Sequence, residues 1–142
     1  MRKAITIHDL NQEQVASIEK HMLGEMRELD YKHPLRSLFL AAWSDFRYGK
    51  FSYDGATFSK SRYGKDMIFE LAAFIHDWRN HNGYVSYKVD EEMFSIMIIL
   101  NYPLRYIIQR RLLTIFTFLN IFRHFIKGTL RKGEPYNLYL LW

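Results

Sequence analysis

The sequence predicts a small all-α domain. Apolar side chains recur every three or four residues over several long segments, which is the periodicity of helices with one buried face. The 142 residues are 49% hydrophobic and 17% aromatic, which excludes a disordered or fibrous chain and suits a single domain over residues 1–142. We expect about five helices around an antiparallel helix pair, with one irregular loop. The predicted segments are two helices in 11–49, a loop in 50–64, the helix pair in 65–101, a long apolar helix in 103–127 and a basic, then aromatic tail in 129–142.

Two amphipathic helices are expected in the first third of the chain. The first spans 11–29, where apolar residues follow helical spacing and Asn11 with Gln14 resembles a capping pair. Pro34 interrupts this pattern. It suits the first position of a second helix, because proline lacks the backbone N–H that a first turn leaves unpaired. The second helix is expected to end at Gly49.

The segment 50–64 has a different character. Gly, Ser, Asp and aromatic residues predominate there, and Asp54-Gly55 is a turn signal, so we expect an ordered loop. Helical spacing then returns in 65–81 and again in 87–101. Because only a short glycine-containing turn separates these two helices, they are expected to be antiparallel neighbours.

The long helix predicted over 103–127 is almost entirely apolar. A helix of this composition is typical of the centre of a small domain. The alternative is an interfacial membrane helix with arginine at both ends. The tail that follows ends in YNLYLLW, which is too apolar to remain solvated, so it should pack on the domain or dock on another chain. The polar residues of the helix form a narrow stripe: Arg110, Thr114, Thr117, Asn120, His124 and Lys127.

The chain has no cysteine, which excludes disulfides and thiolate metal sites and suits a reducing compartment. Its first residues lack the apolar core of a signal peptide. Its longest strongly apolar run, Leu112 to Phe122, is shorter than the roughly 20 residues that a spanning helix needs. We therefore expect neither a signal peptide nor a transmembrane helix.

Positive charge is concentrated in the last third of the chain. The net charge is +5 overall, but about −1 over the first hundred residues and +6 from Asn101 onward, where Glu134 is the only acidic residue. Such asymmetry indicates an anionic partner. A protein chain and a membrane surface both fit. Nucleic acid remains an alternative, although no nucleic-acid-binding motif is present. The candidate partner-binding residues are Arg105, Arg110, Arg111, Arg123, Lys127, Arg131, Lys132 and Trp142.

His76 and Asp90 are the most chemically suggestive pair. Each lies seven residues from Gly83, so a hairpin folded about that glycine places them side by side. A carboxylate within hydrogen-bonding reach of an imidazole fixes the tautomer and orientation of the ring, which a general base acting on water requires. The structural alternative is that the helix dipole favours Asp90 in the first turn of its helix and that His76 only packs against it.

Asp77 is the candidate metal ligand. It projects about 100° away from His76 around the same helix. A carboxylate in this position could bind a hard cation such as Ca²⁺ if a nearby loop supplied further oxygen ligands. The Asp-Gly-Ala-Thr sequence that begins at Asp54 is the candidate loop, with Asp54 as its own candidate ligand.

Three short motifs surround these residues: Tyr53-Asp-Gly-Ala-Thr57, Glu70-Leu-Ala-Ala-Phe-Ile-His-Asp-Trp78 and Val89-Asp-Glu-Glu-Met-Phe94. Together they resemble a small domain common in bacteriophage genomes. In that domain an Asp-Gly-Ala-Ser/Thr loop precedes a helix carrying His-Asp-Trp-x-Tyr, and a second helix carries an Asp followed by aliphatic and aromatic residues. The resemblance covers roughly residues 50–125 and implies a phage-encoded protein.

The same helix pair is similar to the core of phospholipase A2, in which His-Asp-x-x-Tyr on one helix faces an Asp on its antiparallel partner. This resemblance implies that His76 is the general base, that Asp77 is a Ca²⁺ ligand and that Asp90 orients His76. The sequence differs from the pattern in three respects. The chain has no cysteine, so the disulfides of secreted phospholipases are absent. Asn80 stands where both families have Tyr, and the short turn at Asp54 is the only counterpart of a glycine-rich calcium loop.

Two hypotheses of different classes follow. The first is a phage-type accessory or structural virion protein without catalysis, which binds a capsid or other virion chain, a membrane or nucleic acid through its basic C-terminal third. The second is a Ca²⁺-dependent, phospholipase A2-like lipid or ester hydrolase that uses His76 and Asp90. The sequence favours the first because of Asn80 and the reduced loop. Under either hypothesis we expect the protein in the host cytoplasm or the virion.

Overall fold

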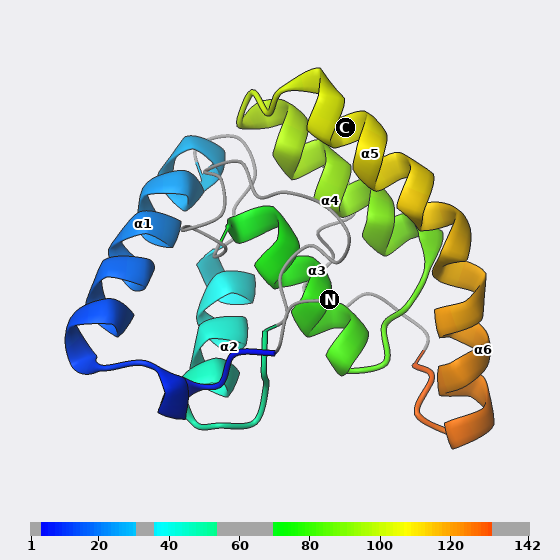
Figure 1. The fold of residues 1–142 in the computed structure, drawn as a ribbon, viewed down its shortest axis with the longest axis horizontal. Helices are drawn as coiled ribbons and strands as arrows, with labels where there is room; N and C mark the ends of the chain where they lie inside the picture. The colour runs from blue at the N-terminus through cyan, green and yellow to red at the C-terminus, as the bar shows by residue number, and fades with distance from the viewer. Residues whose placement is uncertain (1–3, 31–35, 54–69, 132–142) are drawn as a thin grey trace.

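The computed structural model describes residues 4–30, 36–53 and 70–131. Six α-helices fill most of these ranges (Figure 1). Within the same ranges, extended pairing is limited to one isolated antiparallel bridge between Ile5 and Tyr53. The protein is therefore all-α. The helices are α1 (Gln12–Asp30), α2 (Arg36–Arg47), α3 (Leu71–His81), α4 (Tyr87–Ile99), α5 (Leu104–Leu113) and α6 (Thr117–Lys127), with the 3-10 turns η1 (Ile7–Asp9) and η2 (Thr114–Phe116).

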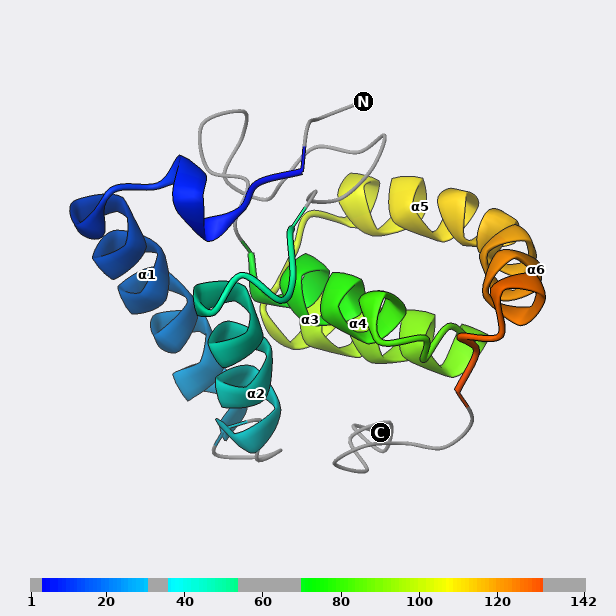
Figure 2. The same ribbon diagram turned by 90° about the horizontal axis from the view of Figure 1, so that it is seen from below.

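The antiparallel pair α3 and α4 occupies the centre of the fold. In both Figure 1 and Figure 2, α1 and α2 lie on one side of this pair, and α5 and α6 lie on the other. The helix α6 forms the outer edge of the molecule. The order of the layers therefore follows the order of the chain, and the C-terminal helices reach only one side of the central pair.

Local capping explains where two of the helices begin. The predicted capping pair is present: Asn11 Oδ1 accepts from the Gln14 backbone N–H at 2.8 Å, and Gln14 Oε1 accepts from the Asn11 backbone N–H at 3.0 Å. At the start of α4, the Ser86 hydroxyl accepts from the Val89 N–H at 3.3 Å. This cap fixes the first turn of α4 and with it the position of Asp90.

An aromatic cluster fills the core between α2 and α3. The ring of Phe74 lies 5.4–6.0 Å from those of Trp43, Phe46, Phe51 and Tyr53. All five residues are buried. Burial of one such side chain stabilises the fold by about 1.5–3 kcal/mol, so this cluster is a main source of stability.

The helix α3 begins later than the periodicity predicts. The prediction placed its start at residue 65, but Glu70 has extended backbone angles (φ −136°, ψ 144°) and the first helical residue is Leu71. The side chain of Glu70 is fully buried and forms an ion pair with Arg110 of α5. The Leu71 N–H donates to the buried carboxylate of Glu25 at 3.2 Å. These tertiary contacts anchor the first turn, and sequence periodicity does not record them.

A buried ion pair joins the two central helices. Arg79 of α3 donates to Glu92 of α4 through both Nε, at 2.9 Å, and Nη2, at 2.8 Å. The two side chains are 0% and 1% exposed. Two charges removed from water require such bidentate geometry, because the desolvation of each ion costs several kcal/mol. The pair therefore fixes how α3 and α4 are aligned.

The prediction of a single long helix over 103–127 is wrong. The chain forms α5, then the 3-10 turn η2, then α6. At the break the Thr114 hydroxyl donates to the Arg111 carbonyl at 2.6 Å. A threonine hydroxyl bonded in this way competes with the regular helical hydrogen bonds and favours a bend.

The interpretation of this segment as the central helix of the domain is also wrong. None of the residues of α6 is buried, and Arg110 is the only buried residue of α5. The segment lies at the edge of the molecule, with α6 at its outer border (Figure 1). Among the residues that the structure describes, no helix is long and apolar enough to cross a membrane.

We predict that Glu92→Gln lowers the free energy of unfolding by about 3–5 kcal/mol, because it removes the carboxylate that binds the buried Arg79 guanidinium through two N–H groups. Urea denaturation measures this loss. The matched control is Glu91→Gln, which breaks the half-exposed pair between Glu91 and Arg111 and should cost less than about 1 kcal/mol. Equal losses from the two variants would contradict the structural role of the buried pair.

Candidate active site

His76 and Asp90 are in direct contact, as the position of the turn predicts. His76 Nε2 lies 2.7 Å from Asp90 Oδ1. The His76 side chain is 20% exposed, whereas that of Asp90 is 5% exposed. Within the described part of the chain, the other ring nitrogen, Nδ1, has no hydrogen-bonding partner. If Asp90 is ionised, it accepts the proton on Nε2, and the lone pair of Nδ1 is then available to accept one.

Asp90 also holds a third helix. Its second oxygen, Oδ2, accepts a hydrogen bond from the Thr117 hydroxyl at 2.6 Å. Thr117 is the first residue of α6, so α3, α4 and α6 meet at this one carboxylate. With both oxygens engaged, Asp90 is fixed in position, and His76 has a rigid partner.

A pocket of about 670 Å³ opens beside the pair. One wall comes from α3, where Asn80 follows His76 by one helical turn and exposed His81 lies at the end of the helix. The opposite wall comes from α5 and α6. A pocket of this size accommodates a small organic ligand. Its polar lining residues from α5 to α6 are Arg110, Thr114, Thr117, Asn120, Arg123 and His124.

The polar stripe of the predicted long helix is therefore the second wall of the site. Five of its six residues line the pocket: Arg110, Thr114, Thr117, Asn120 and His124. The sequence shows that the stripe exists, but helical spacing does not reveal what it faces. The role of Thr117 was missed for this reason. The signal that could have revealed this role was the polar stripe on an otherwise apolar helix.

The far end of α6 is attached to the turn between α3 and α4. The Arg131 N–H donates to the Gly83 carbonyl at 2.9 Å. Gly83 has a φ of +85°, which favours glycine, and an added Cβ would overlap the carbonyl oxygen of Thr129. The helix α6 is thus fastened at its start through Thr117 and just beyond its end through Arg131, with the pocket between these two points.

Positive groups surround His124 on the pocket wall. Partial burial lowers the pKa of His124 below its usual value of 6.5, and the nearby charges of Lys127, Arg123 and His81 lower it further. The ring is therefore neutral at pH 7. Its Nδ1 lies 2.8 Å from the Thr129 hydroxyl, which connects it to the segment that packs on Gly83.

The described residues do not by themselves fit a calcium ion. Asp77 lines the pocket beside His76, but Asp90 is the only other carboxylate of the described lining, and both of its oxygens are already engaged. Ca²⁺ takes six to eight oxygen ligands. Within the described ranges no group of three metal-ligating side chains is found. The candidate ligand Asp54 lies outside the residues that the structure describes.

The basic residues of the C-terminal third do not share one environment. Arg110 is buried against Glu70, and Arg111 forms a half-exposed pair with Glu91 at 2.9 Å. The other described members are exposed: Arg105, Arg123, Lys127 and Arg131. Lys132 and Trp142 lie outside the described residues. The exposed cations are therefore found along α5, along α6 and just beyond it.

No protein family, curated protein or solved structure matches the chain at a significant level. The fold and the site define an all-α protein in which a His-Asp pair lines a pocket of mixed polar and apolar residues.

We predict that the His124 ring titrates with a midpoint below 6.5, observable by NMR. Because its pKa is lowered in the folded state, its contribution to stability is complete above the unfolded value and is lost as the pH falls below it. Between about pH 7.5 and about pH 5, the wild type should lose more unfolding free energy than His124→Gln. Parallel stability curves for the two proteins would contradict this assignment.

Proposed function

We propose that the protein is a hydrolase in which the His76-Asp90 pair activates water for attack on an ester. The observation that carries this proposal is that His76, held by a buried carboxylate at 2.7 Å, lines a pocket of about 670 Å³. The free Nδ1 at a pocket wall favours a role as a base.

The geometry suggests a balanced hydrolytic sequence. A water molecule hydrogen-bonded to His76 Nδ1 transfers a proton to the ring as its oxygen bonds to the ester carbonyl carbon. Asp90 stabilises the imidazolium that results. When the bond from the carbonyl carbon to the alcohol oxygen breaks, the imidazolium returns its proton to that oxygen. The products are a carboxylic acid and an alcohol.

The oxyanion formed in the first step needs hydrogen-bond donors or positive charge. Two pocket residues offer them. The Asn80 amide lies on the same face of α3 as His76, and the exposed guanidinium of Arg123 lies on the opposite wall. Asn80, which departs from the Tyr of the similar families, is then a candidate donor in its own right.

The pocket lining also suggests the substrate class. Beside the polar groups it contains apolar side chains from several parts of the chain, among them Phe51, Met93, Leu113 and Leu119. An ester with an apolar acyl part and a polar alcohol part suits this mixture. The similarity to phospholipase A2 supports a lipid ester, and it is the reason to include Ca²⁺ in the assays.

The non-catalytic role, which the sequence placed first, rests on the basic C-terminal third. The exposed basic residues there support a binding surface, and such a surface does not compete with hydrolysis in the pocket. We therefore propose catalysis for the pocket and a separate binding role for the exposed basic residues.

The test is hydrolysis of a soluble p-nitrophenyl acyl ester and of a dispersed phospholipid, each with Ca²⁺ and with a chelator. His76→Asn should lower kcat/KM by roughly 100-fold or more, the usual contribution of a general base. Asp90→Asn should also lower kcat/KM, because it disturbs the tautomer of the ring.

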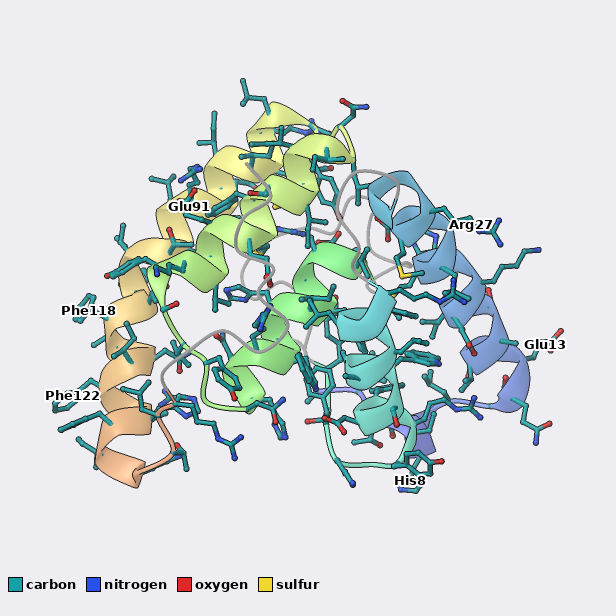
Figure 3. All side chains as sticks on the ribbon, turned by 180° about the vertical axis from the view of Figure 1, so that it is seen from behind. His8, Glu13, Arg27, Glu91, Phe118 and Phe122 are labelled. Carbon is teal, nitrogen blue, oxygen red and sulfur yellow. The ribbon has the colours of Figure 1, made fainter. Side chains whose placement is uncertain are left out.

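The matched control is His8→Asn. His8 is an exposed histidine of η1 on the far side of the molecule from α6 (Figure 3). It should leave turnover unchanged, and circular dichroism should show that every variant is folded. A wild type that releases no acid from either ester, with or without Ca²⁺, would overturn the proposal. So would a His76→Asn protein as active as the wild type.

A further inference from the structure

The side of α6 that faces away from the pocket is covered by large apolar residues. Phe118, Phe122, Phe125 and Ile126 are 55–69% exposed, and we call these four residues the outer face. Figure 3 shows Phe118 and Phe122 pointing away from the rest of the molecule. Of the fourteen exposed large hydrophobic residues in the described ranges, ten lie between Leu104 and Ile126. So large a contiguous apolar surface marks an interaction site.

The two sides of α6 are opposite in chemistry. Thr117, Asn120 and His124 follow helical spacing on the side that lines the pocket, and the outer face follows the same spacing on the other. An ordinary surface helix turns its apolar side inward. In α6 the apolar side is directed outward. An apolar hollow of about 460 Å³, lined by Phe118, Phe122 and four other apolar residues, lies along it.

Positive charge accompanies this face without any negative charge. From Asn101 to Arg131 the chain contains no Asp or Glu. Arg123 and Lys127 are exposed on α6, and Arg105 and Arg131 are exposed at the two ends of the α5–α6 segment. Apolar aromatic residues flanked by Lys and Arg are the composition of helices that lie in the interface of anionic membranes.

We propose that the outer face of α6 docks the protein on an anionic lipid surface. The aromatic side chains would enter the boundary between headgroups and acyl chains, while Arg123 and Lys127 contact lipid phosphates. A second copy of the chain fits less well, because a symmetric contact would bring the same cations together with no acidic partner from this segment. The docking does not rest on the proposed hydrolysis, although it would place the pocket wall next to a lipid ester.

The experiment is cosedimentation of the full chain with vesicles of phosphatidylcholine, with and without phosphatidylglycerol. The wild type should bind the anionic vesicles and bind neutral vesicles much more weakly. The double variant Phe118→Ser/Phe122→Ser should lose at least tenfold in affinity, by the order of magnitude expected for two buried aromatic anchors. Arg123→Gln/Lys127→Gln should weaken anionic binding by roughly fivefold per charge and reduce its salt dependence.

The matched control is Tyr48→Ser, which removes an aromatic residue that is more exposed (79%) than Phe118 or Phe122 and lies just beyond the end of α2. It should bind as the wild type does. Because all of these positions are exposed, the variants should fold, and circular dichroism checks this. Absence of wild-type binding to anionic vesicles, or full binding by Phe118→Ser/Phe122→Ser, would overturn the proposal.

Two further outcomes separate this proposal from others. A wild-type dimer that becomes monomeric in the Phe118→Ser/Phe122→Ser protein would assign the outer face to a second copy and overturn membrane docking. His76→Asn should bind vesicles normally, since His76 lies on the other side of α6. Vesicle binding without ester hydrolysis would therefore uphold docking and reject the proposed function. Hydrolysis of the soluble ester without vesicle binding would uphold the proposed function and reject docking.

Discussion

The buried contact between α3 and α4 is the constraint on which the site depends. Arg79 and Glu92 are closed off from solvent and bonded through two N–H groups, so neither helix can slide or rotate without exposing a charge to an apolar environment. This alignment brings Asp90 opposite His76. The aromatic cluster around Phe74 fills the core between α2 and α3, but such clusters tolerate small shifts. The directional ion pair defines the geometry, and the contact between His76 and Asp90 follows from it.

The second constraint is the attachment of α6. The hydrogen bond from Thr117 to Asp90 and the packing of the segment 129–131 on Gly83 hold the helix across the central pair. Between these points α6 has no buried residue, so it is held by its ends more than by its body. A helix attached in this way can border a pocket without filling it. Asp90 thus has two structural roles, because it orients His76 and fixes the start of the pocket wall.

Local features of the sequence predicted much of the fold. The capping pair at Asn11 and the all-α class follow from short-range patterns, and the contact between His76 and Asp90 follows from their equal distances to the turn. Long-range pairings were not predictable in this way. Glu70 has extended backbone angles just before α3 and pairs with Arg110 of α5, and no local pattern indicates which distant charge a buried residue will find. Periodicity likewise identifies an apolar face without showing what covers it, which is why the C-terminal helices were wrongly placed at the centre.

The reversed amphipathicity of α6 connects the pocket with the surface. The polar residues of this helix need partners, and Asp90 and the segment after α6 supply them on the inner side. Once that side faces the protein, the opposite side, with Phe118 and Phe122, must face outward, although its exposure to water is unfavourable. The exposed apolar surface is thus a consequence of building the pocket wall from α6. A contact that covers this surface removes that cost, and an anionic lipid layer covers it while also pairing the cations beside it.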